Sequence, residues 1–457
     1  MKRRLVAVSG FLFGFGLFAS AASIPLPEGL RAVNVFSGIP MADDDNPNKT
    51  GGFGDVAVNL VMAVELKSRY PKLRVRLLVT SLAKRDQPQI PTSNEIIKIM
   101  VPDLNPELKQ TPQIYRGVEV VFLDYDIGLL FDTKALKLPY ERVRDDLPQL
   151  VPPADLNLNF SHYVGGGAVV RIGAPVALAF EEQFGGRQWV KESEAPQLGQ
   201  GAFLTLSSGP GTAGYVLSEK ERPRAKDLSL IRNWLASQGK VMDTPFDMAF
   251  AYTSEWQSTQ IYIDTISALG RTHGTRPLVL LIKKFSELDL SDLPDNVHVI
   301  QSSAVPHDVM AAMIWHSTVP PLVTGDTSLG LALSSTTPTK TFAYEAPPWK
   351  NGNAGSMKQI LTERAGVGAR KLDAMFLYTQ KLADLTREDL RRRGKKLARL
   401  FDDTETQTRL YHALESVHDR WDLLGNALRI YRRVKGKTER TALRDAVTSC
   451  AAALALK

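Results

Sequence analysis

Short apolar runs alternate with amphipathic stretches along most of this chain. Residues 31–36 and 75–80 are apolar runs of strand length, and residues 56–70 between them carry apolar side chains at helical spacing until Pro71. A strand, a helix and a second strand in this order predict a βαβ unit with parallel strands.

The same alternation continues to about residue 345. The further predicted strands are 118–123, 168–172, 202–206, 246–252, 278–282, 297–300, 322–323 and 341–344, and the further predicted helices are 257–269, 309–315 and 329–333. Strands that alternate with helices favour parallel sheets. No short-period repeat is present, which disfavours solenoids and propellers.

The length of the chain requires more than one domain. Its 457 residues, 44% of them hydrophobic, are two to three times the common domain size. We therefore predict an α/β protein with two Rossmann-like domains facing across a cleft and a helical C-terminal tail. The expected boundaries are 23–240 for the first domain, 241–370 for the second and 371–457 for the tail.

The first 22 residues form a segment of their own. Three basic residues precede an apolar run, and Ala19-Ser20-Ala21 is a small-residue cleavage pattern. This predicts a secretory signal peptide over residues 1–22 and a periplasmic or secreted protein. An uncleaved membrane anchor is the alternative, although the run is short for spanning about 30 Å of hydrocarbon. The single cysteine, Cys450, excludes an internal disulfide.

Positive charge is concentrated in the tail. The formal net charge is +7, and residues 371–457 contain nineteen Lys and Arg against twelve Asp and Glu. Two interpretations stay open: contact with an anionic envelope surface, or the solvated face of amphipathic helices.

The first candidate motif is a glycine turn that ends in an acid. Gly52, Phe53 and Gly54 precede Asp55 at the start of the predicted helix 56–70. Glycines permit close approach of the backbone, and a helix start directs its dipole at a ligand. Asp55 is thus a candidate general base beside an acceptor-side loop. Its alternative role is capping the helix.

The second candidate motif follows the predicted strand 322–323. Gly325 is succeeded by Asp326, Thr327 and Ser328, which offer free amides, hydroxyls and one carboxylate at a helix start. Such a turn suits a diphosphate. The alternative is an ordinary helix cap by Asp326 or Thr327.

Three further residues are donor-binding candidates by position. Ser254 and Lys283 follow predicted strands of the second domain, and Glu345 follows another. Ligands bind outside the carboxyl ends of parallel strands, so these side chains are expected at the cleft. A surface lysine that ends a strand is the alternative for Lys283, and Glu345 needs no ligand to explain it.

These motifs resemble those of the GT-B glycosyltransferases, specifically the heptosyltransferases and the bacterial protein-arginine rhamnosyltransferases. The resemblance rests on Gly54-Asp55-Val56 and on residues 325–328, and covers the organisation of residues 30–360. It implies that Asp55 is the base and that Asp326, Thr327 and Ser328 face a nucleotide sugar. The rhamnosyltransferases carry two successive acids in the donor loop, where this chain has Asp326-Thr327. Those enzymes also work in the cytoplasm, whereas this chain is predicted to be exported.

The chemistry implied is inverting, metal-independent transfer from a nucleotide or lipid diphosphate donor to a glycan, lipid or protein acceptor. No cofactor and no nucleic acid partner are expected. The alternative is an exported bilobal carbohydrate-binding or envelope-interaction protein without turnover.

No metal site is predicted. The histidines lack zinc spacing, and residues 43–45 lack the spaced ligands of a calcium loop. Asp124-Tyr125-Asp126 resembles the acid-x-acid metal turn of GT-A glycosyltransferases, which is the one alternative with a metal.

Overall fold

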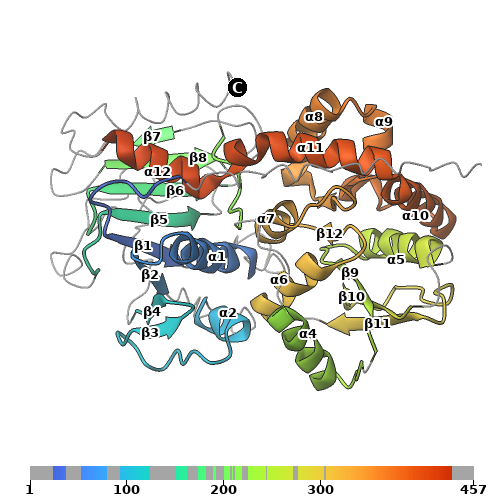
Figure 1. The fold of residues 1–457 in the computed structure, drawn as a ribbon, viewed down its shortest axis with the longest axis horizontal. Coiled ribbons are helices and arrows are strands. Elements are labelled where there is room, and N and C mark those ends of the chain that lie inside the picture. Colours follow the sequence, from blue (N-terminus) through green and yellow to red (C-terminus); the bar gives the residue numbers. More distant parts are fainter. Residues whose placement is uncertain are drawn as a thin grey trace, which may run out of the picture.

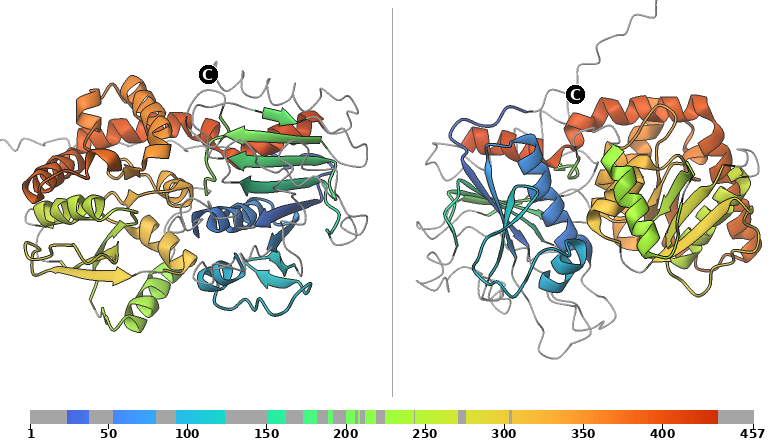
Figure 2. Two further views of the ribbon diagram at one scale, coloured as in Figure 1. Left: turned by 180° about the vertical axis from the view of Figure 1, so that it is seen from behind. Right: turned by 60° about the horizontal axis from the view of Figure 1, so that its bottom comes forward.

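The computed structural model describes thirteen parts of the chain. They are residues 24–37, 53–79, 93–123, 151–161, 173–181, 189–191, 200–205, 208, 212–218, 225–242, 244–270, 276–302 and 305–434. Within them the chain forms two lobes side by side, each built on a sheet, with C-terminal helices running across both (Figures 1 and 2).

The first lobe contains an eight-stranded sheet in the order β3-β4-β2-β1-β5-β6-β8-β7. Its elements are β1 (Ala32–Ser37), α1 (Phe53–Arg69), β2 (Arg74–Val79), α2 (Ser93–Met100), β3 (Gln113–Tyr115), β4 (Val118–Phe122), β5 (Leu156–Ser161), β6 (Val176–Glu181), β7 (Trp189–Lys191) and β8 (Gln200–Thr205). The six central strands are parallel, and only β3 and β7 pair antiparallel, one at each edge.

The second lobe contains a six-stranded, fully parallel sheet in the order β11-β10-β9-β12-β13-β14. Its strands are β9 (Asp247–Ala251), β10 (Leu278–Lys283), β11 (Val297–Ser302), β12 (Leu322–Val323), β13 (Ala343–Ala346) and β14 (Phe376–Tyr378). Its helices are α4 (Ala225–Ser237), α5 (Trp256–Gly270), α6 (His307–His316), α7 (Asp326–Ser334), η2 (Pro348–Lys350), α8 (Asn351–Ala365), α9 (Ala369–Leu372), η3 (Thr379–Lys381), α10 (Arg387–Asp402) and α11 (Thr404–Trp421).

Both sheets follow the doubly wound strand order of a Rossmann fold. Among the parallel strands of each sheet, the first strand lies in the middle, the next two add on one side and the following three add on the other. The order reverses between β1 and β5 in the first sheet and between β9 and β12 in the second. At such a switch point the chain segments that leave the carboxyl ends of the two neighbouring strands run in opposite directions, which opens a crevice between them.

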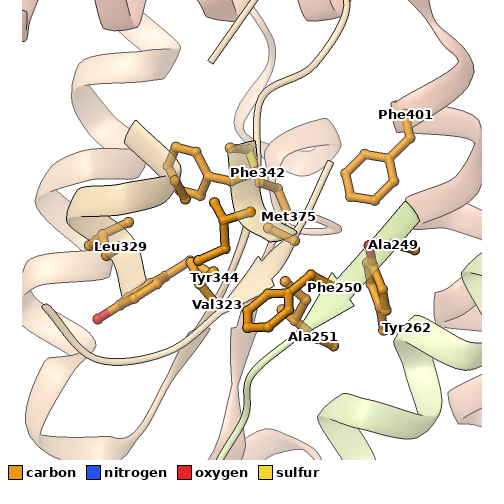
Figure 3. Close-up of a cluster of buried hydrophobic side chains, with 14 of the residues drawn as sticks. Ala249, Phe250, Ala251, Tyr262, Val323, Leu329, Phe342, Tyr344, Met375 and Phe401 are labelled. Atoms are coloured by element: carbon orange, nitrogen blue, oxygen red, sulfur yellow. The ribbon is translucent and has the colours of Figure 1, made fainter. Parts of the chain in front are cut away.

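The core of the second lobe joins its sheet to helices on both faces. Phe250, Tyr344 and Phe342 are almost completely buried beside Tyr262 of α5 and Phe401 of α10 (Figure 3). The central strands β9 and β10 are near-continuous apolar runs because both faces of the sheet are covered there. This burial on both faces explains why apolar runs of strand length predicted these strands from the sequence.

One hinge connects the lobes through two crossing segments. Residues 212–218 run from the first lobe to the second, and the joint between α11 and α12 (Leu423–Val434) runs back. The Tyr215 N–H donates to Trp421 O at 2.7 Å, and the Leu423 N–H donates to Tyr215 O at 2.9 Å. The Tyr215 and Trp421 rings meet edge to face at 6.1 Å. The two crossings are therefore locked together as one short ladder.

The side chains of the hinge divide between the two cores. Trp421 belongs to the core of the second lobe, whereas residues from Leu423 onward belong to that of the first. α12 thus completes the first lobe although it is the last helix in the described part of the chain. This is the GT-B organisation, two Rossmann-like domains and C-terminal helices that cross between them.

A buried arginine fastens the hinge to α1. Arg69 pairs with Glu65 at 2.8 Å and Asp422 at 2.7 Å, and also donates to the Leu217 carbonyl. Burial lowers the pKa of the guanidinium, but Asp422 and Glu65 outweigh it and the net change is upward. One side chain therefore joins α1, the linker and the start of α12.

A second contact joins the lobes away from the hinge. The β3–β4 turn has positive φ at Arg116 and Gly117, as a two-residue hairpin requires. It presents Arg116 2.7 Å from Asp308 of α6, while the Tyr115 hydroxyl donates to Asp308 at 2.6 Å. We call Tyr115, Arg116 and Asp308 the latch.

The fold class predicted from the sequence is confirmed by these two sheets and the C-terminal helices. Two details differ from the expected boundaries. The edge strand β14 lies inside the segment predicted as a helical tail, and β5 was not predicted because Asn157 and Asn159 interrupt its apolar run. β6 was also not predicted, although its run is continuously apolar up to Glu181. The predicted signal peptide and the predicted strand 168–172 lie outside the described residues. In the part of the chain that is described, no helix is both long and apolar enough to traverse a bilayer.

Candidate functional site

The two glycine motifs lie at the two switch points. The first follows β1, and the second follows β12. The helices that they begin, α1 and α7, pack against each other across the lobe interface (Figure 1). Sequence positions about 270 residues apart are therefore brought to one interface by the symmetry of the two folds.

Asp55 is the third residue of α1, not the residue before the helix. A helix that starts at Phe53 disfavours the capping role, because a cap lies outside the helix that it closes. Phe53 and Gly54 share this first turn, whereas Gly52 lies outside the described residues. The backbone thus places the predicted base in the first turn of α1.

The N-terminus of α7 lacks a side-chain cap. Gly325 occupies the cap position with φ 76°, a conformation that favours glycine, and this cap residue supplies no side-chain hydrogen bond to the helix. A Cβ at Gly325 would meet nothing within 4 Å, so the turn borders open space. Amides of this kind suit an anion.

The two hydroxyls of the second motif differ. The Ser328 hydroxyl turns back and donates to the Thr324 carbonyl within its own loop. The Thr327 hydroxyl is buried and has no hydrogen-bond partner among the described residues. An unsatisfied buried hydroxyl costs about 1–3 kcal/mol, which a ligand atom at this point would offset. Thr327 is consequently the more direct probe for a ligand, and Ser328 shapes the loop.

The Asp326 carboxylate faces a cation. Lys350 Nζ lies 3.2 Å from Asp326 Oδ2, with both side chains at most 7% exposed. Burial raises the pKa of the nearby Tyr215 phenol, Asp326 raises it further and Lys350 opposes the change. The phenol donates to Asn353 Oδ1. An acid beside a diphosphate site would repel the ligand, and Lys350 offsets that charge.

Glu345 is fully buried and already bound by protein groups. Its Oε2 accepts from the Ser254 N–H at 2.6 Å and the Ser254 hydroxyl at 3.0 Å, and its Oε1 accepts from the Glu255 N–H at 3.0 Å. Burial raises the pKa of Glu345, although these donors act against the rise. Glu345 therefore fixes the turn that follows β9 at the switch point. Direct contact between Glu345 and a sugar donor stays a prediction.

Lys283 ends β10 and is half-buried, with its ammonium 5.3 Å from the centre of the Phe285 ring. This cation–π contact holds the charge near the carboxyl edge of the sheet. Ser254 thus lies just beyond β9 and Lys283 ends the adjacent β10, and their contact with a ligand stays a prediction.

Sequence reasoning missed Lys350, Tyr215 and Asn353. Lys350 lies just beyond the carboxyl end of β13, so the rule that selected Glu345 would have found it. Tyr215 belongs to the interlobe linker, and no sequence pattern indicates that it approaches Asp326. Among the described residues no group of His, Cys, Asp or Glu side chains could hold a metal ion. The acidic stretches at 43–45 and 124–126 lie outside those residues.

No protein-family model and no curated protein matches this chain. Solved structures similar to it include a family 9 glycosyl transferase from Veillonella parvula, at 11% identity over 71% of this chain and 82% of that one, with a TM-score of 0.33. Acinetobacter baumannii MurG is 15% identical over 85% and 99%, with a TM-score of 0.41.

The glycosyltransferase VinC, solved with dTDP, is 13% identical over 93% and 100%, with a TM-score of 0.41. These solved structures are glycosyltransferases. The fold class of this chain follows from the order of its strands.

Proposed function

We propose that this protein is a glycosyltransferase that binds a nucleotide sugar at the N-terminus of α7 and receives its acceptor beside the N-terminus of α1. The observation that supports this most is the packing of α1 against α7, which brings the switch points of two Rossmann-like sheets to one interface. A donor on one side and an acceptor on the other is the arrangement that transfer needs.

The diphosphate is proposed to lie on the uncapped amides of α7. The Thr327 hydroxyl gains a partner there, and Lys350 supplies positive charge beside Asp326. Amides and a cation stabilise negative charge as it develops on the leaving diphosphate. Lys283 is proposed to contribute to the same field from the neighbouring strand.

Asp55 is proposed to remove the proton from the acceptor while the acceptor attacks the anomeric carbon. The proton passes to the carboxylate, the new glycosidic bond forms and the bond to the diphosphate breaks. A single displacement of this kind inverts the anomeric centre. Inversion and independence from metal are parts of the proposal. Export directed by residues 1–22 is a further part. An exported enzyme would require a lipid-linked donor, or would act after delivery into another cell.

The first experiment measures binding of a panel of nucleotide sugars to the full chain by calorimetry. Thr327→Val keeps the shape of the side chain and removes the hydroxyl, so we expect about tenfold weaker binding. Thr336→Val is the control, because Thr336 is also buried but lies beyond the other end of α7 and donates to Leu333 O.

The second experiment separates binding from chemistry. Asp55→Asn should retain donor binding and lose turnover, measured as donor hydrolysis or transfer. Unchanged turnover in Asp55→Asn would remove the base from the proposal. Binding of glycans with no binding of any nucleotide would instead support the alternative, a carbohydrate-binding protein without turnover.

A further inference from the structure

A charged groove lies between α9 and α10. Figure 1 places these two helices at the end of the second lobe that is remote from the first sheet. The groove has a volume of about 720 Å³, within the range of ligand sites. Its walls come from α9 and the segment after it on one side and from α10 on the other. Six basic side chains line it: Arg370, Lys371, Arg392, Arg393, Lys396 and Arg399. We call this the basic groove.

The three carboxylates of the basic groove are bound by other groups. Asp389 closes the capping box of α10 with Thr386 and pairs with Arg392. Asp403 caps α11 and pairs with Lys371. Asp373 pairs with Lys358, which is not a wall residue. Two of the acids therefore cap helices, and the three acids together form ion pairs with only two of the six cations in the groove.

Four cations remain without an ion pair among the described residues. They are Arg370, Arg393, Lys396 and Arg399. Arg393, Lys396 and Arg399 repeat along one face of α10, and Arg370 approaches from α9. Like charges gathered around a hollow destabilise a fold unless an anion offsets them. Arginine guanidinium groups match phosphate oxygens in pairs, which lysine-only surfaces do not.

The floor of the groove is apolar. Leu377 of β14 and Leu400 of α10 are at most 2% exposed, with Ala374 and Leu385 beside them. Cations on facing walls above an apolar floor suit a compact body that carries several phosphates. A flat membrane surface would meet only the rim of such a hollow.

We propose that the basic groove is a second binding site, separate from the cleft between the lobes, for a compact compound that carries two or more phosphate groups. The compound is either a free phosphorylated metabolite or the phosphorylated sugar headgroup of a lipid, since both present the same chemistry. The proposal does not depend on glycosyl transfer.

The test uses myo-inositol hexakisphosphate as the probe and the full chain in calorimetry. We expect saturable binding to a single class of sites that weakens steeply with salt. Arg393→Gln and Lys396→Gln should each weaken binding about tenfold, because each removes a charge-assisted contact. Lys395→Gln is the matched control. It removes the same charge from the residue immediately before Lys396 in α10, and Lys395 does not line the groove. Its effect should stay within about twofold.

Two vesicle samples separate the sources of the phosphate. Flotation with phosphatidylcholine vesicles that contain a lipid with a diphosphorylated sugar headgroup, lost in Lys396→Gln and kept in Lys395→Gln, would assign the headgroup. Probe binding without flotation would assign a free compound. Absence of saturable binding, or equal losses in Lys396→Gln and Lys395→Gln, would overturn the proposal. So would loss of probe binding in Thr327→Val, because the probe would then occupy the cleft.

Discussion

The hinge and the latch connect the same two lobes by different means. The hinge is buried, contains two crossing backbones and places apolar side chains in both cores. The latch is polar and partly exposed, with the Arg116 side chain 45% exposed and that of Asp308 26% exposed. The hinge therefore behaves as part of the fold, whereas the latch can open without unfolding either lobe.

Backbone contacts strengthen this contrast. At the hinge, α7 approaches the linker so closely that a Cβ on Gly330 would lie 2.2 Å from the Val216 carbonyl oxygen. At the latch, side chains alone make the contact. The proposed transfer requires the lobes to admit a donor and an acceptor, for which one fixed axis and one releasable contact are suited.

The largest effect is expected from Arg69→Leu at the hinge. The change leaves Glu65 and Asp422 buried without their cation, which costs about 3–5 kcal/mol. Chemical denaturation measures the loss. Arg74→Leu is the control, because that side chain is 56% exposed and its pair with Glu119 contributes below about 1 kcal/mol. Equal losses in both variants would contradict a special role for the buried arginine.

Gly330→Ala should follow in size. The added methyl group collides with backbone of the linker, and overpacking of this kind costs about 1–3 kcal/mol. Gly355→Ala in α8 is the matched control, since a Cβ there meets nothing within 4 Å and alanine favours the helix. Melting temperatures of the two variants should move in opposite directions. A Gly330→Ala protein as stable as wild type would mean that α7 does not approach the carbonyl of Val216 this closely.

Asp308→Asn tests the latch and its pH dependence. Burial alone would raise the pKa of Asp308, yet His307, Arg116 and Tyr115 bring it down to about 2. The stabilisation is therefore fully present above about pH 4 and is lost as pH falls toward the folded value. We expect Asp308→Asn to cost about 1–2 kcal/mol at neutral pH. The difference from wild type should shrink below about pH 4, and a difference that is constant with pH would argue against the ion pair.

The smallest effect is expected from Tyr115→Phe. It removes one hydrogen bond from Asp308 and keeps the pair with Arg116, which costs about 0.5–1.5 kcal/mol. In a double-mutant cycle with Asp308→Asn the two losses should be less than additive. Small-angle scattering on the same variants should show a wider spread of lobe separations. Additive losses would place the tyrosine outside the latch.

Much of the second lobe could be predicted from the sequence. β9, β10 and β12 are apolar and buried on both faces, so the length and spacing of their apolar runs indicate strands directly. The first lobe was harder to predict. β5 places Asn157 and Asn159 between apolar residues, and both asparagines are buried in the structure, so their polarity concealed a central strand.

The candidate site divides in the same way. Glycine before a helix is a local signal, and it marked both Asp55 and the turn at Gly325. The partner of Asp326 is not a local signal, because Lys350 comes 24 positions later and reaches Asp326 only when α7 and η2 pack. Likewise the basic residues of α10 and α9 are separate runs in the sequence, and folding makes them the walls of one groove.

The sequence by itself determined two Rossmann-like α/β halves and a glycine turn before a helix in each, because strand burial and glycine turns depend on residues close together in the chain. Only the tertiary structure decided that α1 packs on α7, that α12 returns to the first lobe and that Thr327 lacks a partner among the described residues. Those outcomes depend on contacts between residues hundreds of positions apart, which the packing of buried surface selects and no local pattern records.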